Sequence, residues 1–272
     1  MLAALISALL LVGGGGPAVA ERPVAITAAG GELTLAGTLT VPPEPGPHPA
    51  AVLLGGFGPN DRDGAFGGRD GGAYRTWADE LAERGVAVLR YDKRGIGESQ
   101  GPALSWLDAR PLATDAAAAA RTLAGLPGID PERVTLIGHS QGGTLAYAAA
   151  RTAPVTRIVT VAAPGRPLGL LSRASGAAGR FLTRLVGPGV AGATLRRDPR
   201  PAAARAPQPA LLVHGTADRT VPVADMAALA RARERAGRSS ETLRLPGAGH
   251  FASVDGRVPE GAFDAIAGFA RG

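Results

Sequence analysis

Short apolar runs alternate along this chain with longer segments in which apolar residues recur at helical spacing. The apolar runs are strand-like and cover residues 50–54, 86–91, 134–138, 158–161, 210–214 and 242–245. Segments with the spacing of amphipathic helices lie between or after them, at residues 74–84, 113–126, 141–151, 224–236 and 261–270. Strands that alternate with helices in this way predict an α/β fold, a mostly parallel central sheet with helices on both faces.

Two further strand-like runs open this pattern at residues 23–28 and 32–41. Gly30 and Gly31 separate them, so the pair predicts an antiparallel hairpin. Residues 51–54 and 210–213 are apolar throughout, as expected for central strands that are buried on both faces. In such sheets the functional residues lie in loops after the carboxyl ends of the strands. The search for chemistry is therefore restricted to those loops.

The amino terminus differs from the rest of the chain. An apolar run at residues 2–12 is followed by four glycines, Pro17 and a small-residue site just before Glu21. This order is typical of a secretory signal peptide, although no basic residue precedes the apolar run, and eleven residues are too few to span a bilayer as a helix. We expect a leader over residues 1–20, a secreted product and one domain over residues 21–272. The alternative is a cytoplasmic protein with an ordinary apolar first segment.

Composition removes several classes of site. The chain has 272 residues, 45% of them hydrophobic, which is enough for a sizeable core. It contains no cysteine, so disulfides, thiolate metal sites and cysteine nucleophiles are excluded. The acidic run 61–63 is interpreted as loop-ordering ion pairs rather than as a metal site.

The pattern Gly-x-Ser-x-Gly occurs twice, at residues 97–101 and 138–142. A nucleophile elbow needs a strand before the serine and a helix after it, with glycines that allow a tight bend. Only the second match has that context. Ser140 is therefore the candidate nucleophile, Gly138 and Gly142 are the elbow glycines, and Ser99 is a loop serine.

A serine nucleophile needs a base and a carboxylate that orients the base. His250 follows the strand that ends near Leu245, and Asp218 follows the strand 210–214, so both lie in the expected loops. Their order after Ser140 is the order that a Ser-Asp-His triad takes in this fold. Asp255 is the reserve candidate for the acid.

An acyl-transfer site also needs backbone N–H groups that bind the oxyanion of the tetrahedral intermediate. We expect one from Gln141, the first residue of the helix after the nucleophile. The second is expected from the glycine-rich loop 55–58, at Phe57.

The ordered set of these segments resembles the α/β-hydrolase superfamily. The resemblance rests on residues 138–142, 91–99, 214–218 and 249–250, and covers about residues 23–271. Residues 56–63 are similar to a loop of bacterial esterases related to the serine aminopeptidase-like branch. The family implies a Ser-His-Asp triad, no cofactor, and ester, thioester or amide hydrolysis through an acyl-enzyme. The sequence departs from it at Gly55, where many relatives carry histidine.

An arginine-rich insertion interrupts the pattern at about residues 164–207. It carries a net charge of +7, whereas the whole chain carries +6. No nucleic-acid motif accompanies it and aromatic residues make up 4% of the chain, so nucleic acid is not an expected partner. Relatives insert a cap at this position, and the residues fit a small helical cap with a solvated basic face. Attraction to anionic substrates or to a membrane surface is the less favoured alternative.

We therefore expect an enzyme that cleaves carboxylic esters of a small-molecule acyl substrate. A cap poor in carboxylates is a poor host for the ammonium terminus of a peptide, which ranks an esterase above an aminopeptidase. The alternatives are a thioesterase, an acyltransferase with the same triad, and a non-catalytic binding protein that kept the fold.

Overall fold

The computed structural model describes residues 19–65, 71–102, 104–167 and 196–272. The expected leader at residues 1–20 lies almost wholly outside the described residues. So does most of the expected cap at 164–207, of which only the two ends are described. Both therefore stay predictions.

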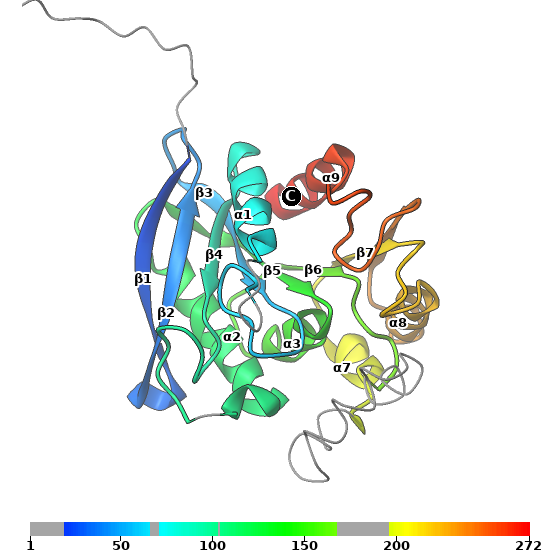
Figure 1. Cartoon of the computed structure of the whole chain (residues 1–272), viewed down its shortest axis with the longest axis horizontal. Helices are drawn as coiled ribbons and strands as arrows, with labels where there is room; N and C mark the ends of the chain where they lie inside the picture. The colour runs from blue at the N-terminus through cyan, green and yellow to red at the C-terminus, as the bar shows by residue number, and fades with distance from the viewer. Residues whose placement is uncertain (1–18, 66–70, 103, 168–195) are drawn as a thin grey trace, which may run out of the picture.

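One eight-stranded sheet organises the described chain, in the order β1-β2-β4-β3-β5-β6-β7-β8 (Figure 1). The first two strands form the expected hairpin, and β2 also pairs antiparallel with β4; all other pairs are parallel. The strands are β1 (Ala20–Ala28), β2 (Leu33–Val41), β3 (His48–Leu54), β4 (Ala87–Tyr91), β5 (Ile129–His139), β6 (Arg157–Val161), β7 (Ala210–Gly215) and β8 (Ser240–Leu245). The predicted fold class, a mostly parallel α/β sheet, is confirmed.

Helices cover both faces of this sheet. They are α1 (Ala73–Glu83), α2 (Ala109–Ala124), α3 (Gln141–Ala149), α7 (Arg200–Arg205), α8 (Ala224–Arg235) and α9 (Glu260–Arg271), with short 3₁₀ turns at Ala29–Gly31 and Ser105–Leu107. Apolar residues of α1 and α9 belong to one core cluster, and those of α2, α3, α7 and α8 belong to the other. Figure 1 shows α1 and α9 together at the top of the view and α2 and α3 at the bottom.

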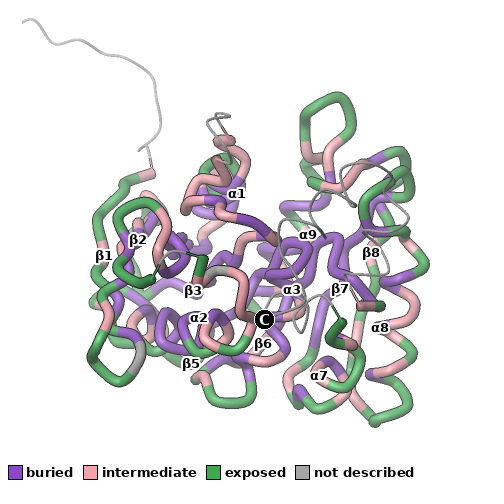
Figure 2. The backbone as a smooth tube through the Cα atoms, turned by 60° about the horizontal axis from the view of Figure 1, so that its bottom comes forward, coloured by how far each residue is buried: buried purple, intermediate pink, exposed green. Residues whose placement is uncertain are grey.

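Alternating side chains of the central strands feed these two cores. In β3, Val52 and Leu54 point into the cluster beneath α2 and α3, whereas Ala51 and Leu53 point into the cluster beneath α1 and α9. This is the period of two that a strand imposes, with both faces apolar because both are covered. Figure 2 shows the consequence: the middle of the sheet is buried, and exposed residues lie on the edge strand β1, on the outer sides of helices and in loops.

The start of α2 was predicted four residues too late. Pro111 lies in the first turn of the observed helix, where proline is tolerated because the N–H groups of that turn have no intrahelical partner. The Asp108 side chain caps the helix by accepting the N–H of Arg110 at 3.0 Å.

Candidate active site

Ser140 occupies a sharp turn between the end of β5 and the start of α3. Its backbone has φ 53° and ψ −121°, a strained conformation for a residue with a side chain. A Cβ at Gly142 would lie 2.1 Å from the carbonyl oxygen of Leu54, and one at Gly138 would lie 2.3 Å from the backbone of Gly142. Only glycine fits at these two positions, so the local structure is that of a nucleophile elbow.

Asp218 and His250 meet after β7 and β8. The Nδ1–H of His250 donates to Asp218 Oδ2 at 2.8 Å, and the other carboxylate oxygen accepts the N–H groups of Thr220 and Val221 at 2.8 and 2.9 Å. His214, at 3.4 Å, faces the same carboxylate while its Nε2 bonds the carbonyl of Val221. The carboxylate is thus fixed by its own turn, and the hydrogen bond leaves His250 Nε2 available as a proton acceptor.

The environment of Asp218 keeps its carboxylate ionised. Burial raises the pKa of Asp218, but the hydrogen bonds with His214 and His250 outweigh burial and hold that pKa well below its ordinary value. A permanently charged carboxylate can stabilise an imidazolium on His250, which is the role of the acid in a triad.

The loop of His250 is attached to the elbow through His139, the residue before the nucleophile. His139 Nε2 lies 3.0 Å from the carbonyl oxygen of His250, and the two imidazole rings are 4.8 Å apart. Ser140 is buried, and its hydroxyl makes no hydrogen bond within the described chain, to His250 or to any other residue. Catalytic hydrogen bonds of this kind often form only when substrate is bound. The structure therefore joins Asp218 to His250 and brings the His250 loop against the elbow.

A chain of buried hydrogen bonds fixes the protonation of His139. The N–H of Gly56 donates to Tyr74 Oη at 2.9 Å, and Tyr74 Oη lies 2.9 Å from His139 Nδ1. The tyrosine oxygen already accepts one hydrogen bond, so its own hydrogen is directed at Nδ1, and Nε2–H donates to the carbonyl of His250. Burial lowers the pKa of His139 to about 3, so this imidazole is neutral at neutral pH.

Tyr74 also explains the departure at Gly55. A Cβ at Gly55 would lie 3.0 Å from the Tyr74 ring, so the space beside this residue is filled by an aromatic side chain from α1. Sequence reasoning missed both Tyr74 and the role of His139. A histidine inside the elbow was visible, but nothing in the sequence paired it with a tyrosine 65 positions away.

Lys93 binds the expected oxyanion loop after β3 through hydrogen bonds. The amine of this buried lysine donates to the carbonyl oxygens of Gly56 and Gly58 and to Asn60 Oδ1, the last two at 2.9 and 2.8 Å. Phe57 lies between the two glycines that Lys93 binds, and Gln141 is the first residue of α3, as expected. The oxyanion roles of these two N–H groups stay predictions. Lys93 was visible only as part of a motif, with no role assigned.

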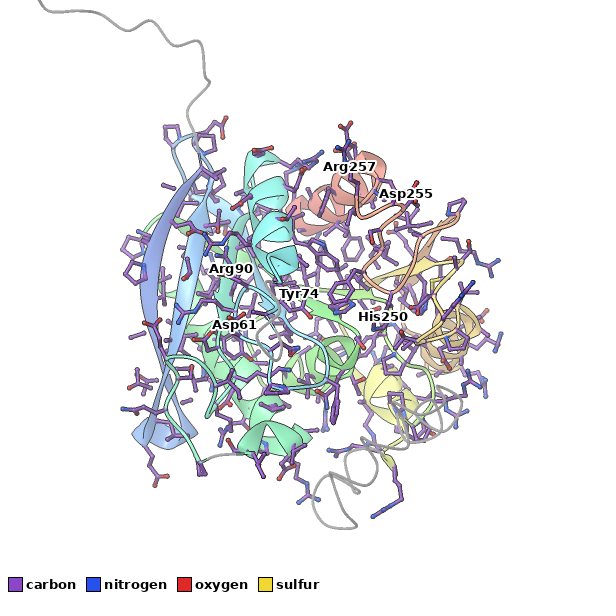
Figure 3. The ribbon with its side chains drawn as sticks, viewed as in Figure 1. Asp61, Tyr74, Arg90, His250, Asp255 and Arg257 are labelled. Atoms are coloured by element: carbon purple, nitrogen blue, oxygen red, sulfur yellow. The ribbon has the colours of Figure 1, made fainter. Side chains whose placement is uncertain are left out.

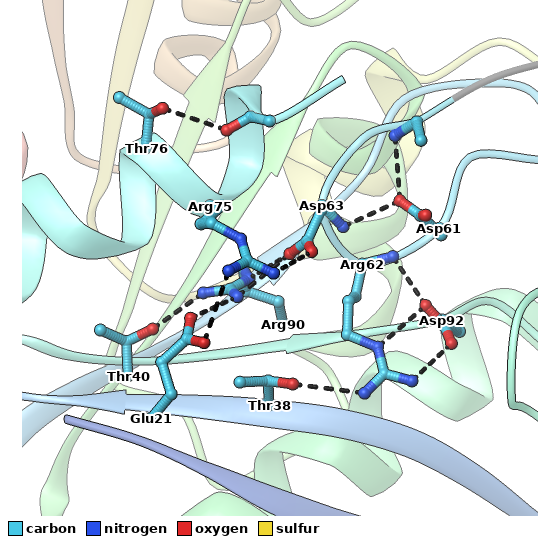
Figure 4. Close-up of polar contacts among 12 residues, drawn as sticks. Glu21, Thr38, Thr40, Asp61, Arg62, Asp63, Arg75, Thr76, Arg90 and Asp92 are labelled. Atoms are coloured by element: carbon cyan, nitrogen blue, oxygen red, sulfur yellow. Dashed lines mark hydrogen bonds and ion pairs between the residues drawn. The ribbon is translucent and has the colours of Figure 1, made fainter. Parts of the chain in front are cut away.

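The acidic run 61–63 forms ion pairs that order the same loop (Figure 4). Arg62 binds Asp92, with Nη2 at 2.7 Å from Oδ2. Asp63 pairs with Arg75 and Arg90 at 2.7 and 3.0 Å, and Asp61 accepts backbone N–H groups of its own turn. Within the described ranges no group of three His, Cys, Asp or Glu side chains is arranged to hold a metal ion.

Asp255, the reserve acid, lies away from these contacts. It is an exposed residue in the turn that Val254 and Arg257 close. In Figure 3 Asp255 and Arg257 lie at the rim of the molecule, whereas Tyr74 lies near its middle. The structure thus gives Asp218, and not Asp255, a contact with His250.

A hollow adjoins the elbow on the side of the insertion. It encloses about 310 Å³, including space open to solvent, and is lined by residues of α3 and by the two described ends of the insertion, Gln141, Thr144, Leu145, Pro164, Arg166, Arg197 and Pro199 among them. Arg166 is bound to Asp225 at 2.7 Å. The hollow therefore lies beside the nucleophile position and has a basic rim.

Comparison with protein families gives two matches along the chain. Residues 67–188, which include Ser140, match the serine aminopeptidase (S33) family, and residues 181–271, which include Asp218 and His250, match the prolyl oligopeptidase family. No helix in the described part of the chain is both long and apolar enough to cross a bilayer.

Individual relatives point the same way. Esterase EstD of Thermotoga maritima is 35% identical over 134 residues, which are 49% of this chain and 31% of EstD. Thiohydrolase aneE of Aspergillus aculeatus is 39% identical over 75 residues, which are 27% of this chain and 24% of aneE. The chain thus spans less than a third of the length of these curated relatives.

Solved structures resemble nearly the whole chain. The α/β hydrolase GrgF of Penicillium has a TM-score of 0.72 and 23% identity, and the match covers 92% of this chain and 98% of GrgF. At this identity the likeness shows the fold. The fold is thus that of the α/β hydrolases, and the family matches and EstD show similarity to the serine aminopeptidase-like esterase branch.

Proposed function

We propose that this chain is a serine hydrolase that cleaves carboxylic esters of small acyl substrates through an acyl-enzyme. The observation that carries the proposal is the Asp218–His250 hydrogen bond, made by a loop that contacts His139, the residue before the elbow serine. The similarity to esterase EstD supports the ester as the scissile bond. A binding module would have no need for an ionised carboxylate aligned on an imidazole.

In the proposed reaction the Ser140 hydroxyl attacks the ester carbonyl and His250 Nε2 takes its proton. The C–O bond to the alcohol then breaks, and the proton on His250 passes to the leaving oxygen. Water attacks the resulting Ser140 ester by the same route and releases the acid. In both halves the oxyanion is bound by the N–H groups of Phe57 and Gln141.

A thioester is the second candidate for the scissile bond, because thiohydrolase aneE is similar to this chain over 75 residues. The same groups would serve it, since a thiolate leaves more readily than an alkoxide. A peptide amide is disfavoured by the basic rim of the hollow. Arg197 there has no ion-pair partner among the described residues and would repel the ammonium group of a free amino terminus.

The test is a panel in which one acyl group is presented as a p-nitrophenyl ester, a thioester and a p-nitroanilide. We expect ester hydrolysis to be fastest, and Ser140→Ala to lower kcat by at least about 10³-fold on every substrate that turns over. Mass spectrometry should find a fluorophosphonate adduct on Ser140.

The matched control is Ser99→Ala, the serine of the other Gly-x-Ser-x-Gly match, which should keep its kcat. An active protein that Ser140→Ala leaves unchanged would exclude the proposed nucleophile. A native protein that cleaves none of the three substrates and takes no adduct would exclude the proposed function.

A further inference from the structure

The buried amine of Lys93 lies behind the loop that carries Phe57. Lys93 is the only lysine of the chain and is 6% exposed. It follows β4, in the segment 91–99 that supports the family resemblance, and nothing in the proposed reaction uses it. Burying a lysine amine is costly unless its N–H groups are all paired, so the position calls for an explanation.

Two features of its surroundings act on the charge of Lys93 in opposite directions, its hydrogen-bond acceptors and its burial. Its nitrogen faces three oxygen acceptors, the carbonyls of Gly56 and Gly58 and the side-chain oxygen of Asn60. Three acceptors need three N–H donors, and only the ammonium form has three and no lone pair. Burial lowers the pKa of Lys93 to about 7, and in the protonated form the positive charge lies directly against the backbone of the loop.

The Gly56 carbonyl and the Phe57 N–H are the two ends of one peptide group. A trans peptide directs these ends in opposite directions. Lys93 and the side-chain amide of Asn60, at 3.3 Å, bind the carbonyl end, so the N–H end is turned away from Lys93.

The opposite side of the loop is the side of the nucleophile. A Cβ added to Gly56 would lie 3.3 Å from Ser140 Cβ and 3.3 Å from His139 Nδ1. The N–H of Gly56 is itself bonded to Tyr74, and the donor that we propose for the substrate carbonyl oxygen is the next N–H along the chain, that of Phe57.

An ammonium group bound to a carbonyl also polarises the peptide. Hydrogen bonds in a chain strengthen one another, by about 10–30% per bond in condensed-phase estimates. Here the chain runs from Lys93 through the peptide to any oxyanion bound at the Phe57 N–H. The gain is largest when full negative charge develops, so it acts on the transition state more than on bound ester.

We propose that Lys93 is a positioning residue that orients and polarises the Gly56–Phe57 peptide as an oxyanion donor. The inference rests on the proposed function and deepens it. Lys93 touches no substrate and acts through the peptide that it binds.

The neighbours of Lys93 provide a matched control. Arg94 is also charged and largely buried, but it binds Asp115 on α2 through two hydrogen bonds of 2.6 and 2.7 Å and does not contact the loop. Lys93→Met and Arg94→Met each remove one charge from adjacent positions and keep most of the side-chain volume. Only the first removes the contact with Gly56.

We expect Lys93→Met to lower kcat about 10- to 100-fold, less than the 10²–10³ that loss of a whole oxyanion donor costs. KM should change less than twofold, and the rate of fluorophosphonate labelling of Ser140 should fall in parallel. Arg94→Met should lower stability and keep kcat within about threefold.

Chemical rescue separates charge from shape. The chain has no cysteine, so Lys93→Cys carries a single thiol that can be alkylated in the unfolded protein before refolding. With 2-bromoethylamine the thiolate displaces bromide and forms a side chain close to lysine in length with a terminal ammonium. With 1-bromopropane it forms an uncharged side chain of the same length.

The aminoethylated protein should regain most of the kcat, and the propylated protein should behave as Lys93→Met. Equal kcat for the two alkylated proteins overturns the proposal. So does a propylated protein that cannot refold while the aminoethylated one can, because the role would then be structural. A native protein without ester hydrolysis or Ser140 labelling overturns the proposed function and the Lys93 role together, whereas an active native protein with an equally active Lys93→Met overturns only the latter.

Discussion

The two Gly-x-Ser-x-Gly segments share a sequence pattern, but their serines have different surroundings. In both, the backbone requires glycine: a Cβ at Gly142 would lie 2.1 Å from the carbonyl oxygen of Leu54, and Gly97 and Gly101 have φ of 54° and 134°. The serines differ. The Ser99 hydroxyl accepts the N–H of Ala36 at 2.9 Å and donates to the Asp92 carbonyl at 2.7 Å, whereas the Ser140 hydroxyl has no partner within the described chain.

This comparison shows that the glycines of the motif report a tight backbone in both segments, and that the two serines differ in what surrounds their hydroxyls. The Ser99 hydroxyl has a structural role, because it accepts a hydrogen bond from one backbone group and donates one to another. Ser140 is held in a strained turn with its hydroxyl unused.

The largest expected effect comes from replacing Asp218, the acid near the second segment. Asp218→Asn should lower kcat about 10⁴-fold, because an amide cannot hold the His250 tautomer or stabilise its charge. Steady-state kinetics on a p-nitrophenyl ester measures it. Asp255→Asn is the control and should stay within twofold; the reverse result would assign the acid to Asp255.

Ser99→Ala should affect stability and not catalysis. The change leaves the N–H of Ala36 without its partner in a partly buried site, which costs about 1–3 kcal/mol of unfolding free energy. Urea unfolding measures the loss, and the kcat of the same preparation should match the native protein. A Ser99→Ala protein that is fully stable but slow would reverse the assignment of the two serines.

His139 should make stability depend on pH. Its folded pKa of about 3 lies below the ordinary 6.5, so below pH 6.5 the unfolded chain takes up the proton first and stability falls as pH falls toward 3. Between pH 7 and 5 this amounts to about 2 kcal/mol.

The measurement compares unfolding of the native protein with His139→Gln at several pH values. The other histidines occur in both proteins and cancel in the difference. The native protein should lose more stability between pH 7 and 5 than His139→Gln does; parallel curves would show that His139 is not held neutral by burial.

The smallest expected effect concerns the link between the elbow and the His250 loop. Tyr74→Phe removes the donor to His139 Nδ1 and the acceptor of the Gly56 N–H, and keeps the ring. We expect kcat to fall about 3- to 10-fold with unchanged KM, because a small loss of positioning raises the barrier without weakening binding. A changed KM with unchanged kcat would place Tyr74 in substrate binding instead.

The periodicity of apolar residues was enough to predict the sheet and the loops that carry the candidate site. Apolar runs set the strands, and the rule that sites follow strand ends led to Asp218 and His250, which the structure joins. The contacts of Lys93 and Tyr74 could not be predicted. They join segments far apart in sequence, and which side chains meet there depends on strand order and on loop conformations that have no local signature.

The hydrogen-bond network of the candidate site has a consequence for how the substrate range of this protein can evolve. Among the described residues, the hydrogen-bond partners of Asp218, His139 and Lys93 all lie outside the insertion at 164–207. The described ends of the insertion adjoin the candidate site at the hollow beside Gln141. Exchange of the insertion for one of different sequence is a route to new substrate ranges that leaves the chemistry in place, for selection in nature and for an engineer alike.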